Sequence, residues 1–216
     1  QLCGTLGKGQ KILILNNPCN PTGAVYPDQE LQALAKVCRE EEVIVISDEI
    51  YSLIDFRKEK FSSIGRYLPE STVVTGGMSK AFSAGGWRLG LAFVPDAMSD
   101  IIKPWNALIS ETFSCVNAPV QYAALEAFFQ FEGLRPQIQR FTEIHSVAGS
   151  YLFKRFMQMD LNCPEPEGAF YLFPDFQNHR EILKKRGITK CHDLVDDLLN
   201  TQQVAMLPGI DFYMKP

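Results

Sequence analysis

Short, uninterrupted apolar runs, each followed by turn-forming or polar residues, constrain the fold of this chain more than any other feature. The first two runs are residues 11–15 (Lys-Ile-Leu-Ile-Leu) and 43–47 (Val-Ile-Val-Ile-Ser), and residues 71–75 form a third. Runs of this length that are rich in Val and Ile are typical of strands buried on both faces of a parallel sheet. The chain is therefore expected to have an α/β fold.

The segments between these runs predict how the strands connect. Pro27 and Asp28 suit the first turn of a helix, and apolar side chains recur at three- and four-residue spacing after them: Leu31, Leu34, Ala35 and Cys38. A strand, a helix and a strand in this order predict a parallel pair. Residues 89–94 are a fourth run, reached by a connection too short for a crossover helix, so this strand should be antiparallel. We expect a mixed, mostly parallel sheet with flanking helices.

The second half of the chain is expected to be mainly helical. Helices are predicted over residues 118–132 and 136–159. The longer helix carries one apolar stripe, formed by Ile138, Phe141, Ile144, Val147, Ala148, Tyr151, Leu152 and Phe156.

A small α+β unit is expected at the end of the sequence. Residues 168–173 and 204–207 are predicted as strands and residues 192–200 as a helix. The expected division is a large domain over residues 1–135, followed over residues 136–216 by a linking helix and part of a small C-terminal domain.

Composition excludes several classes of function. The 216 residues carry a formal net charge of −4 and no basic run, which argues against nucleic-acid binding. No apolar stretch is long enough to cross a bilayer. Six cysteines without a CxxC pair favour a reducing, cytoplasmic setting, and three histidines without ligand spacing argue against a metal site. Because the sequence starts at Gln1 and stops soon after an expected strand, we expect a piece of a longer chain.

Candidate functional residues follow three of the expected strands. Asn20 lies after the first, Asp48 after the second and Lys80 after the third. Ligands of open α/β sheets bind beyond the carboxyl ends of the strands, so these side chains should converge. A desolvated lysine can form a Schiff base with an aldehyde, and a carboxylate can hold the proton on a pyridine nitrogen. The ordinary alternatives are a turn Asn, a helix-capping Asp and a solvated loop Lys.

Three more residues suit the other groups of pyridoxal phosphate (PLP), an aldehyde-bearing phosphate cofactor. The phenol of Tyr51 suits its phenolic oxygen, and the guanidinium of Arg88 and hydroxyl of Ser79 suit its phosphate. Glycines on either side of Lys80, at positions 76, 77, 85 and 86, would let the backbone approach a ligand. The alternatives are a half-buried aromatic residue, a surface ion pair and a hydroxyl that points away.

With these residues the chain resembles the class I and II aminotransferases, PLP-dependent enzymes of fold type I, in their aspartate-aminotransferase-like branch. Residues 17–23 (Asn-Pro-Cys-Asn-Pro-Thr-Gly) are similar to the NPxNPTG turn of that family, residues 48–51 to its DExY element and residues 77–90 to its lysine attachment site. The similarity extends over most of residues 11–175 and includes the Gly-Ala-Phe-Tyr segment at 168–171.

The resemblance implies a role for each candidate. Lys80 would form the Schiff base with the cofactor and shuttle the proton in catalysis. Asp48 would pair with the pyridine nitrogen. By the same resemblance Asn20 and Tyr51 would contact the phenolic oxygen, and Arg88 the phosphate. Gly77 departs from relatives that have Ser or Thr there, so a phosphate contact would come from the backbone or Ser79.

The resemblance also implies the expected activity: transfer of an amino group from an amino acid, with aspartate or broad specificity, to a 2-oxo acid by a cytoplasmic homodimer. Alternatives are a PLP-dependent β-lyase or cyclopropane-forming synthase on the same fold, and the aminotransferase-like sensor domain of a transcription regulator. The family's glycine-rich phosphate segment and the arginine for the substrate carboxylate are expected outside these residues. This piece alone should therefore bind PLP weakly or not at all and be inactive.

Overall fold

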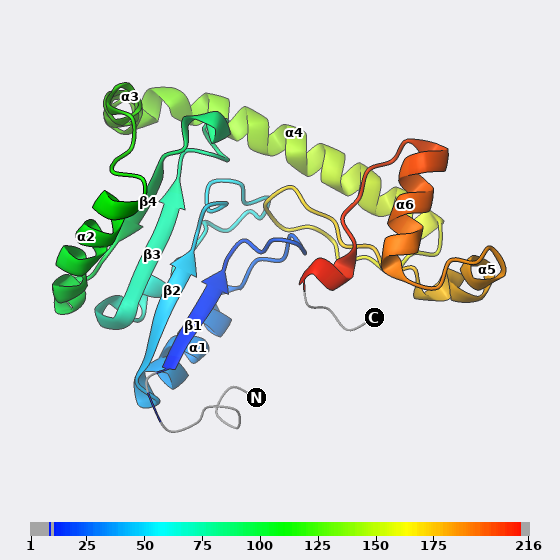
Figure 1. Cartoon of the computed structure of the whole chain (residues 1–216), viewed down its shortest axis with the longest axis horizontal. Helices are drawn as coiled ribbons and strands as arrows, with labels where there is room; N and C mark the ends of the chain where they lie inside the picture. Colours follow the sequence, from blue (N-terminus) through cyan, green and yellow to red (C-terminus); the bar gives the residue numbers. More distant parts are fainter. Residues whose placement is uncertain (1–8, 10, 213–216) are drawn as a thin grey trace.

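The computed structural model describes residue 9 and residues 11–212. A four-stranded sheet lies at its centre, with the strands in chain order: β1 (Lys11–Asn16), β2 (Val43–Asp48), β3 (Thr72–Gly77) and β4 (Gly90–Phe93). The first three strands are parallel, and β4 runs antiparallel to β3 (Figure 1). The structure therefore confirms the mixed sheet and the antiparallel fourth strand.

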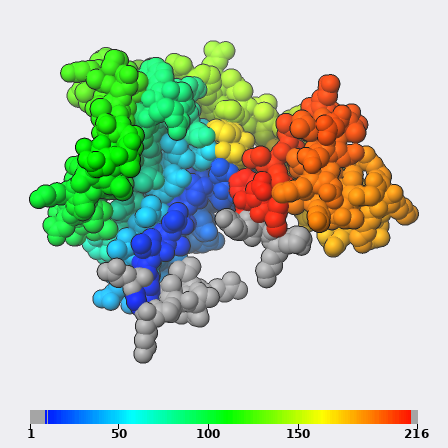
Figure 2. All heavy atoms as spheres, viewed as in Figure 1, coloured from blue at the N-terminus to red at the C-terminus, as the bar shows by residue number. Residues whose placement is uncertain are grey.

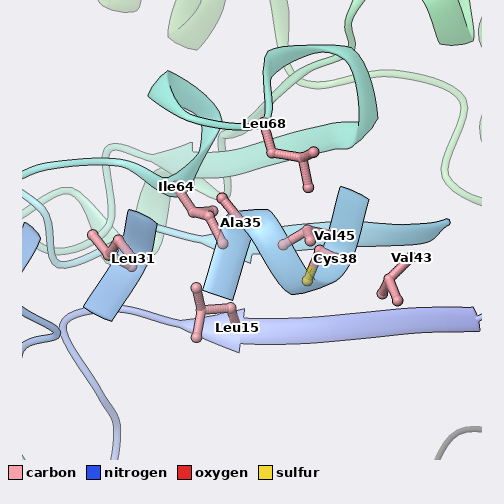
Figure 3. Close-up of a cluster of buried hydrophobic side chains, with 8 residues drawn as sticks. All are labelled: Leu15, Leu31, Ala35, Cys38, Val43, Val45, Ile64 and Leu68. Carbon is pink, nitrogen blue, oxygen red and sulfur yellow. The ribbon is translucent and has the colours of Figure 1, made fainter. Parts of the chain in front are cut away.

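One face of the sheet is covered by helix α1 (Asp28–Glu40), which the apolar spacing predicted. Its buried side chains belong to the cluster drawn in Figure 3, whose members are Leu15, Leu31, Ala35, Cys38, Val43, Val45, Ile64 and Leu68. Burying a Leu, Ile or Val side chain contributes about 1.5–3 kcal/mol. This cluster therefore fixes α1 against the first two strands and sets the position of their carboxyl ends.

The other face of β1 is open. Ile12 and Ile14 are 64% and 72% exposed, whereas Leu15 is buried in the α1 cluster. Successive side chains of a strand point to opposite faces, so the two isoleucines lie on the face away from α1. The expectation that this strand is buried on both faces is wrong for the described residues, because only one face of β1 is covered by a helix.

Helices follow the sheet. They are α2 (Ile102–Thr112), which the sequence reasoning missed, α3 (Ala118–Phe129) and α4 (Phe131–Gln158). The prediction that the long helix starts at Pro136 is wrong, because α4 begins at Phe131 and continues through the proline. Pro136 removes the hydrogen bond of its own nitrogen to the carbonyl of residue 132, and its ring crowds that carbonyl, but both effects fall near the start of α4. The apolar stripe of α4 is largely exposed: Ile138 is buried, but Ile144 and Val147 are 54% and 72% exposed.

The C-terminal part contains α5 (Arg180–Lys185) and α6 (Cys191–Gln202), the second of which confirms the predicted helix. Short 3-10 helices complete the described elements: Ile64–Arg66, Pro69–Ser71, Gly85–Trp87, Asp96–Ile101, Gln177–His179 and Gly209–Phe212. Helix α4 extends from α3 above the sheet to α5 and α6 (Figure 1). On the face shown in Figure 2, the orange and red atoms of the C-terminal part lie to one side of the blue, cyan and green atoms of the sheet region.

The two strands predicted in the C-terminal part are wrong. Residues 204–207 have no regular structure, and residues 168–173 contribute only an isolated bridge between Gly168 and Asp55. The second segment instead lies against loops near the carboxyl end of the sheet. No helix of the described residues has the length and apolar character needed to cross a membrane.

Candidate functional site

The carboxyl edge of the parallel strands aligns Asn16, Asp48 and Thr75 in register. Asn16 Nδ2 donates hydrogen bonds to Asp48 Oδ2 at 3.2 Å and to the Asp48 backbone oxygen at 3.1 Å. The backbone N–H of Ile50 donates to Asp48 Oδ1 at 3.3 Å. Both carboxylate oxygens of Asp48 are therefore held in place by neighbouring groups.

Asn16 is a site residue that the sequence reasoning missed. The available signal was its place directly after the first apolar run, in register with Asp48. The predicted residue, Asn20, lies in the following turn and is exposed, and its backbone N–H donates to Asn16 Oδ1 at 2.6 Å. The structure thus connects Asn20 to Asp48 through the Asn16 side chain.

Lys80 lies in the bend that follows β3, and its side chain reaches two aromatic rings. Its Nζ is 5.3 Å from the ring centroid of Tyr51 and 5.4 Å from that of Phe170. An ammonium within about 6 Å of a ring centroid is attracted by the ring quadrupole. The half-buried amine is therefore held beside Tyr51, which the sequence predicted to share its site.

Tyr51 is buried and hydrogen-bonded to a second phenol. Its Oη is 2.5 Å from the Oη of Tyr171, and the two rings meet edge to face with centroids 5.5 Å apart. Burial raises the pKa of Tyr51, and the nearby charge of Asp48 adds to this. Burial and the hydrogen bond to Tyr51 raise the pKa of Tyr171 to about 12. Both phenols are therefore protonated at neutral pH, and the charge on Asp48 is felt at Tyr51.

Residues 167–171 bring Phe170 and Tyr171 to this place. The backbone N–H groups of Glu167 and Gly168 donate to the Gly23 carbonyl at 2.9 and 3.0 Å, and that of Ala169 donates to the Ile54 carbonyl at 2.8 Å. The segment is thus fixed between the turn after β1 and the loop after β2. The sequence reasoning noted its similarity to a family segment but gave neither aromatic residue a role.

Close approach of the backbone requires glycine at Gly23 and at Gly77. Gly23 has a φ of +71°, and a Cβ there would lie 2.8 Å from the Tyr171 carbonyl oxygen. At Gly77, the last residue of β3, a Cβ would lie 2.7 Å from the Leu89 carbonyl oxygen. A Ser or Thr at position 77 would therefore push β4 away, which accounts for the glycine there.

Ser79 and Arg88 lie on the loop between β3 and β4. Ser79 is half-buried beside Lys80. Arg88 is exposed, has a left-handed backbone with φ 55°, and donates from Nη1 to the Gly85 carbonyl at 2.7 Å. The structure therefore gathers Asn16, Asp48, Tyr51, Lys80, Phe170 and Tyr171 at one place, and it holds the Arg88 guanidinium on the loop backbone.

A second carboxyl group lies beside Asp48 in the chain. Glu49 Oε1 accepts hydrogen bonds from Ser47 Oγ at 2.8 Å and from Ser63 Oγ at 2.5 Å. Burial raises the pKa of Glu49, the two hydroxyl bonds oppose this, and the Asp48 charge raises the pKa further. The described residues contain no group of three or more His, Cys, Asp or Glu side chains placed to hold a metal ion.

Comparison with known proteins identifies the family. The sequence model of the family described as aminotransferase class I and II matches residues 1–216. The chain belongs to this family. Class I and II aminotransferases to which it is similar include the aspartate aminotransferase of Bacillus subtilis, 33% identical over 98% of this chain and 53% of that protein. The aspartate/prephenate aminotransferase of Thermus thermophilus is 36% identical over 94% of this chain and 49% of that protein.

Solved structures of class I and II aminotransferases support the same fold. A double mutant of Thermus thermophilus aspartate aminotransferase matches with a TM-score of 0.87 and 31% identity over 98% of this chain and 52% of that one. The aromatic aminotransferase of Pyrococcus horikoshii matches with a TM-score of 0.85 and 28% identity over 99% of this chain and 54% of that one. The chain thus spans about half the length of the relatives it matches.

Proposed function

We propose that the protein containing this chain transfers an amino group from an amino acid to a 2-oxo acid, with PLP as cofactor. The observation that supports this most directly is the Lys80 amine, held at the rings of Tyr51 and Phe170. The Asn16–Asp48 pair at the carboxyl edge of the sheet lies close enough for its charge to act on Tyr51. Family membership adds the general expectation of amino-group transfer.

The chemistry of the donor set fits PLP group by group. Lys80 supplies the amine for the aldehyde, and Asp48 a carboxylate for the ring nitrogen. Tyr51 and Asn20 supply donors for the phenolic oxygen, and Arg88 and Ser79 donors for the phosphate. When bound, PLP supplies an electron sink for the carbanion that forms when the amino acid loses its α-proton.

The residues of this chain divide the remaining work. Lys80 Nζ holds and moves the proton at the reacting carbon. Asp48, fixed by the Asn16 amide and the Ile50 N–H, keeps its carboxylate directed at one place. The rings of Tyr51 and Phe170 cover the lysine amine and exclude water from that side of it.

Aspartate is the proposed substrate, with broad specificity as the wider possibility, because curated relatives of 31–36% identity carry the name aspartate aminotransferase or aspartate/prephenate aminotransferase. We also propose a homodimer in the cytoplasm. The proposed domain division places residues 1–135 in the large domain and residues 136–216 in the linking helix and small domain. The contacts of Glu167–Ala169 with Gly23 and Ile54 tie the second part to the first.

Lys80→Ala in the full-length protein tests the function. The variant should lose the visible absorption band that PLP gives when bound to a lysine, and it should lose turnover, because the amine proposed to form the Schiff base is removed. Lys103→Ala, an exposed lysine of α2, is the matched control and should keep both. Turnover by Lys80→Ala at the wild-type rate would refute the assignment.

A further inference from the structure

A hydrogen bond at the site joins Tyr51, which has a role in the proposed function, to Tyr171, which has none. The two phenol oxygens are 2.5 Å apart, and Tyr51 is buried. Tyr51 lies under the Lys80 amine and meets Phe170 edge to face at 5.3 Å. Tyr171 reaches this pair from the segment fixed by Gly23 and Ile54, far away in the sequence.

We propose that Tyr171 is a positioning residue, whose phenol donates a hydrogen bond to Tyr51 and leaves the Tyr51 O–H free to donate to the cofactor beside Lys80. This inference rests on the proposed function and deepens it. Two phenols share two hydroxyl hydrogens, and a single hydrogen bond between their oxygens uses one of them. The other hydrogen is available to a ligand, and the direction of the bond decides which tyrosine offers it.

The role proposed for Tyr51 requires donation by Tyr171. If the Tyr51 hydroxyl hydrogen goes to the cofactor, the hydrogen bond between the two oxygens, 2.5 Å apart, must use the hydrogen of Tyr171. The charged groups near the pair are Asp48 at the end of β2 and Lys80 after β3, and the ring of His145 in α4 lies tilted against Phe170 with centroids 5.3 Å apart.

Donation by Tyr171 has two consequences for Tyr51. The rings of Phe170 and Tyr171 already hold the Tyr51 ring, and the hydrogen bond from Tyr171 also fixes the orientation of the Tyr51 hydroxyl. It also polarises the Tyr51 O–H, because hydrogen bonds in a chain strengthen one another. Tyr51 then becomes a stronger and better-directed donor than a lone phenol.

The test is a PLP titration of the full-length protein followed by absorbance, with Tyr171→Phe as the variant, since Phe keeps the ring and removes only the hydroxyl. The dissociation constant of PLP should rise about three- to tenfold, the effect of losing one ordinary hydrogen bond. The pH midpoint of the visible band should also rise. Weaker donation by Tyr51 leaves more negative charge beside the protonated nitrogen at Lys80, so its proton is held more tightly.

A double-mutant cycle separates positioning from a merely structural role. In a Tyr51→Phe background, Tyr171→Phe should produce no further change in the pH midpoint, because Tyr171 acts through Tyr51. Tyr122→Phe, a tyrosine of α3 that is 74% exposed, is the matched control and should behave as wild type. Thermal unfolding of each variant shows whether the fold is kept.

The outcomes distinguish the two proposals. A wild-type midpoint and PLP affinity in Tyr171→Phe would overturn this inference alone, and so would an equal midpoint shift with and without the Tyr51 hydroxyl. A wild-type protein that develops no visible band with PLP would overturn the proposed function and this inference with it.

Discussion

At the scale of single residues, two carboxyl groups that are adjacent in the chain, those of Asp48 and Glu49, have different surroundings. Asp48 is held by amide donors at the edge of the sheet, where a ligand can reach it. Glu49 is held by two hydroxyl groups, and burial raises its pKa. In the proposed function, a charged Asp48 is the working carboxylate. Glu49 is part of the packing beneath it.

We expect Asp48→Asn in the full-length protein to keep the visible band at Lys80 but to slow turnover by several orders of magnitude. The amide can still bond to Asn16, whereas the negative charge that would hold the ring-nitrogen proton is lost. Absorbance spectra and steady-state rates measure the two effects separately. Asp100→Asn, an exposed residue, is the control, and a normal rate in Asp48→Asn would contradict the proposed role.

Glu49→Gln should change how stability depends on pH. Because the folded-state pKa of Glu49 lies above its ordinary value of 4.5, its stabilising contribution is fully present below that value and is lost as pH rises through the folded-state pKa. Both hydroxyl groups bond to Oε1, so the glutamine can keep both bonds.

Urea unfolding at several pH values between 4 and 8 measures this prediction, since each unit of pKa difference is worth about 1.4 kcal/mol. The free energy of unfolding of wild type, relative to Glu49→Gln, should fall as pH rises. A difference that stays constant or increases with pH would show that burial does not raise this pKa.

At the scale of elements, the segment around Gly168 determines whether Phe170 and Tyr171 reach the site. A Cβ at Gly168 would lie 2.8 Å from the Ile54 carbonyl oxygen and about as close to Val25 and Pro18, at 3.0 and 3.1 Å. The first of these is backbone, which cannot move aside as a flexible side chain can. Glycine is therefore required for the segment to pack between the two loops.

Gly168→Ala is expected to destabilise the protein by about 1–3 kcal/mol through this overpacking and to weaken PLP binding. Gly133→Ala is the matched control, because a Cβ there meets no atom within 4 Å and the residue lies in the first turn of α4. That change should be neutral or stabilise by up to about 1 kcal/mol. Thermal and urea unfolding decide the point, and equal effects of the two changes would argue against the packing explanation.

The sequence was informative about elements where local pattern decides structure. The apolar runs predicted all four strands, and the short loop around Lys80 predicted the antiparallel β4, because a crossover needs more residues than this loop has. Residues 168–173 were predicted as a strand and are not one. An apolar segment of this kind has the same sequence pattern whether it pairs with a strand or packs against loops. Here it packs against two loops that are distant in sequence.

The predicted site shows the same limit. Asp48 and Lys80 could be placed near one another because both follow parallel strands. Asn16 offered only its place directly after the first apolar run, because its hydrogen bond to Asp48 depends on strand register. Tyr171 could not be recognised as a neighbour, since its contact depends on the path of the docked segment.

At the scale of the whole molecule, apolar surface is exposed on several elements. Ile12 and Ile14 of β1, Phe93 of β4 and the stripe of α4 are largely exposed. A pocket of about 160 Å³ lies under the Lys80 loop, and its lining includes Met78, Phe82, Trp87 and Ile138. Ile12 and Ile14 lie on the same face of β1, and an exposed apolar patch usually marks a place where more protein packs. The chain also spans only about half of each matched relative.

The chain of 216 residues should therefore bind PLP at least about tenfold more weakly than the full-length protein that contains it. Weaker binding is expected because the apolar pocket beneath the Lys80 loop is open, so ordering this loop uses part of the binding free energy. A tenfold change in the dissociation constant corresponds to about 1.4 kcal/mol. PLP titration followed by absorbance compares the two. The Lys80→Ala form of each corrects for Schiff bases at other lysines. Equal affinity of the two proteins would mean that these residues alone complete the cofactor site, and the exposed apolar surface would then need another explanation.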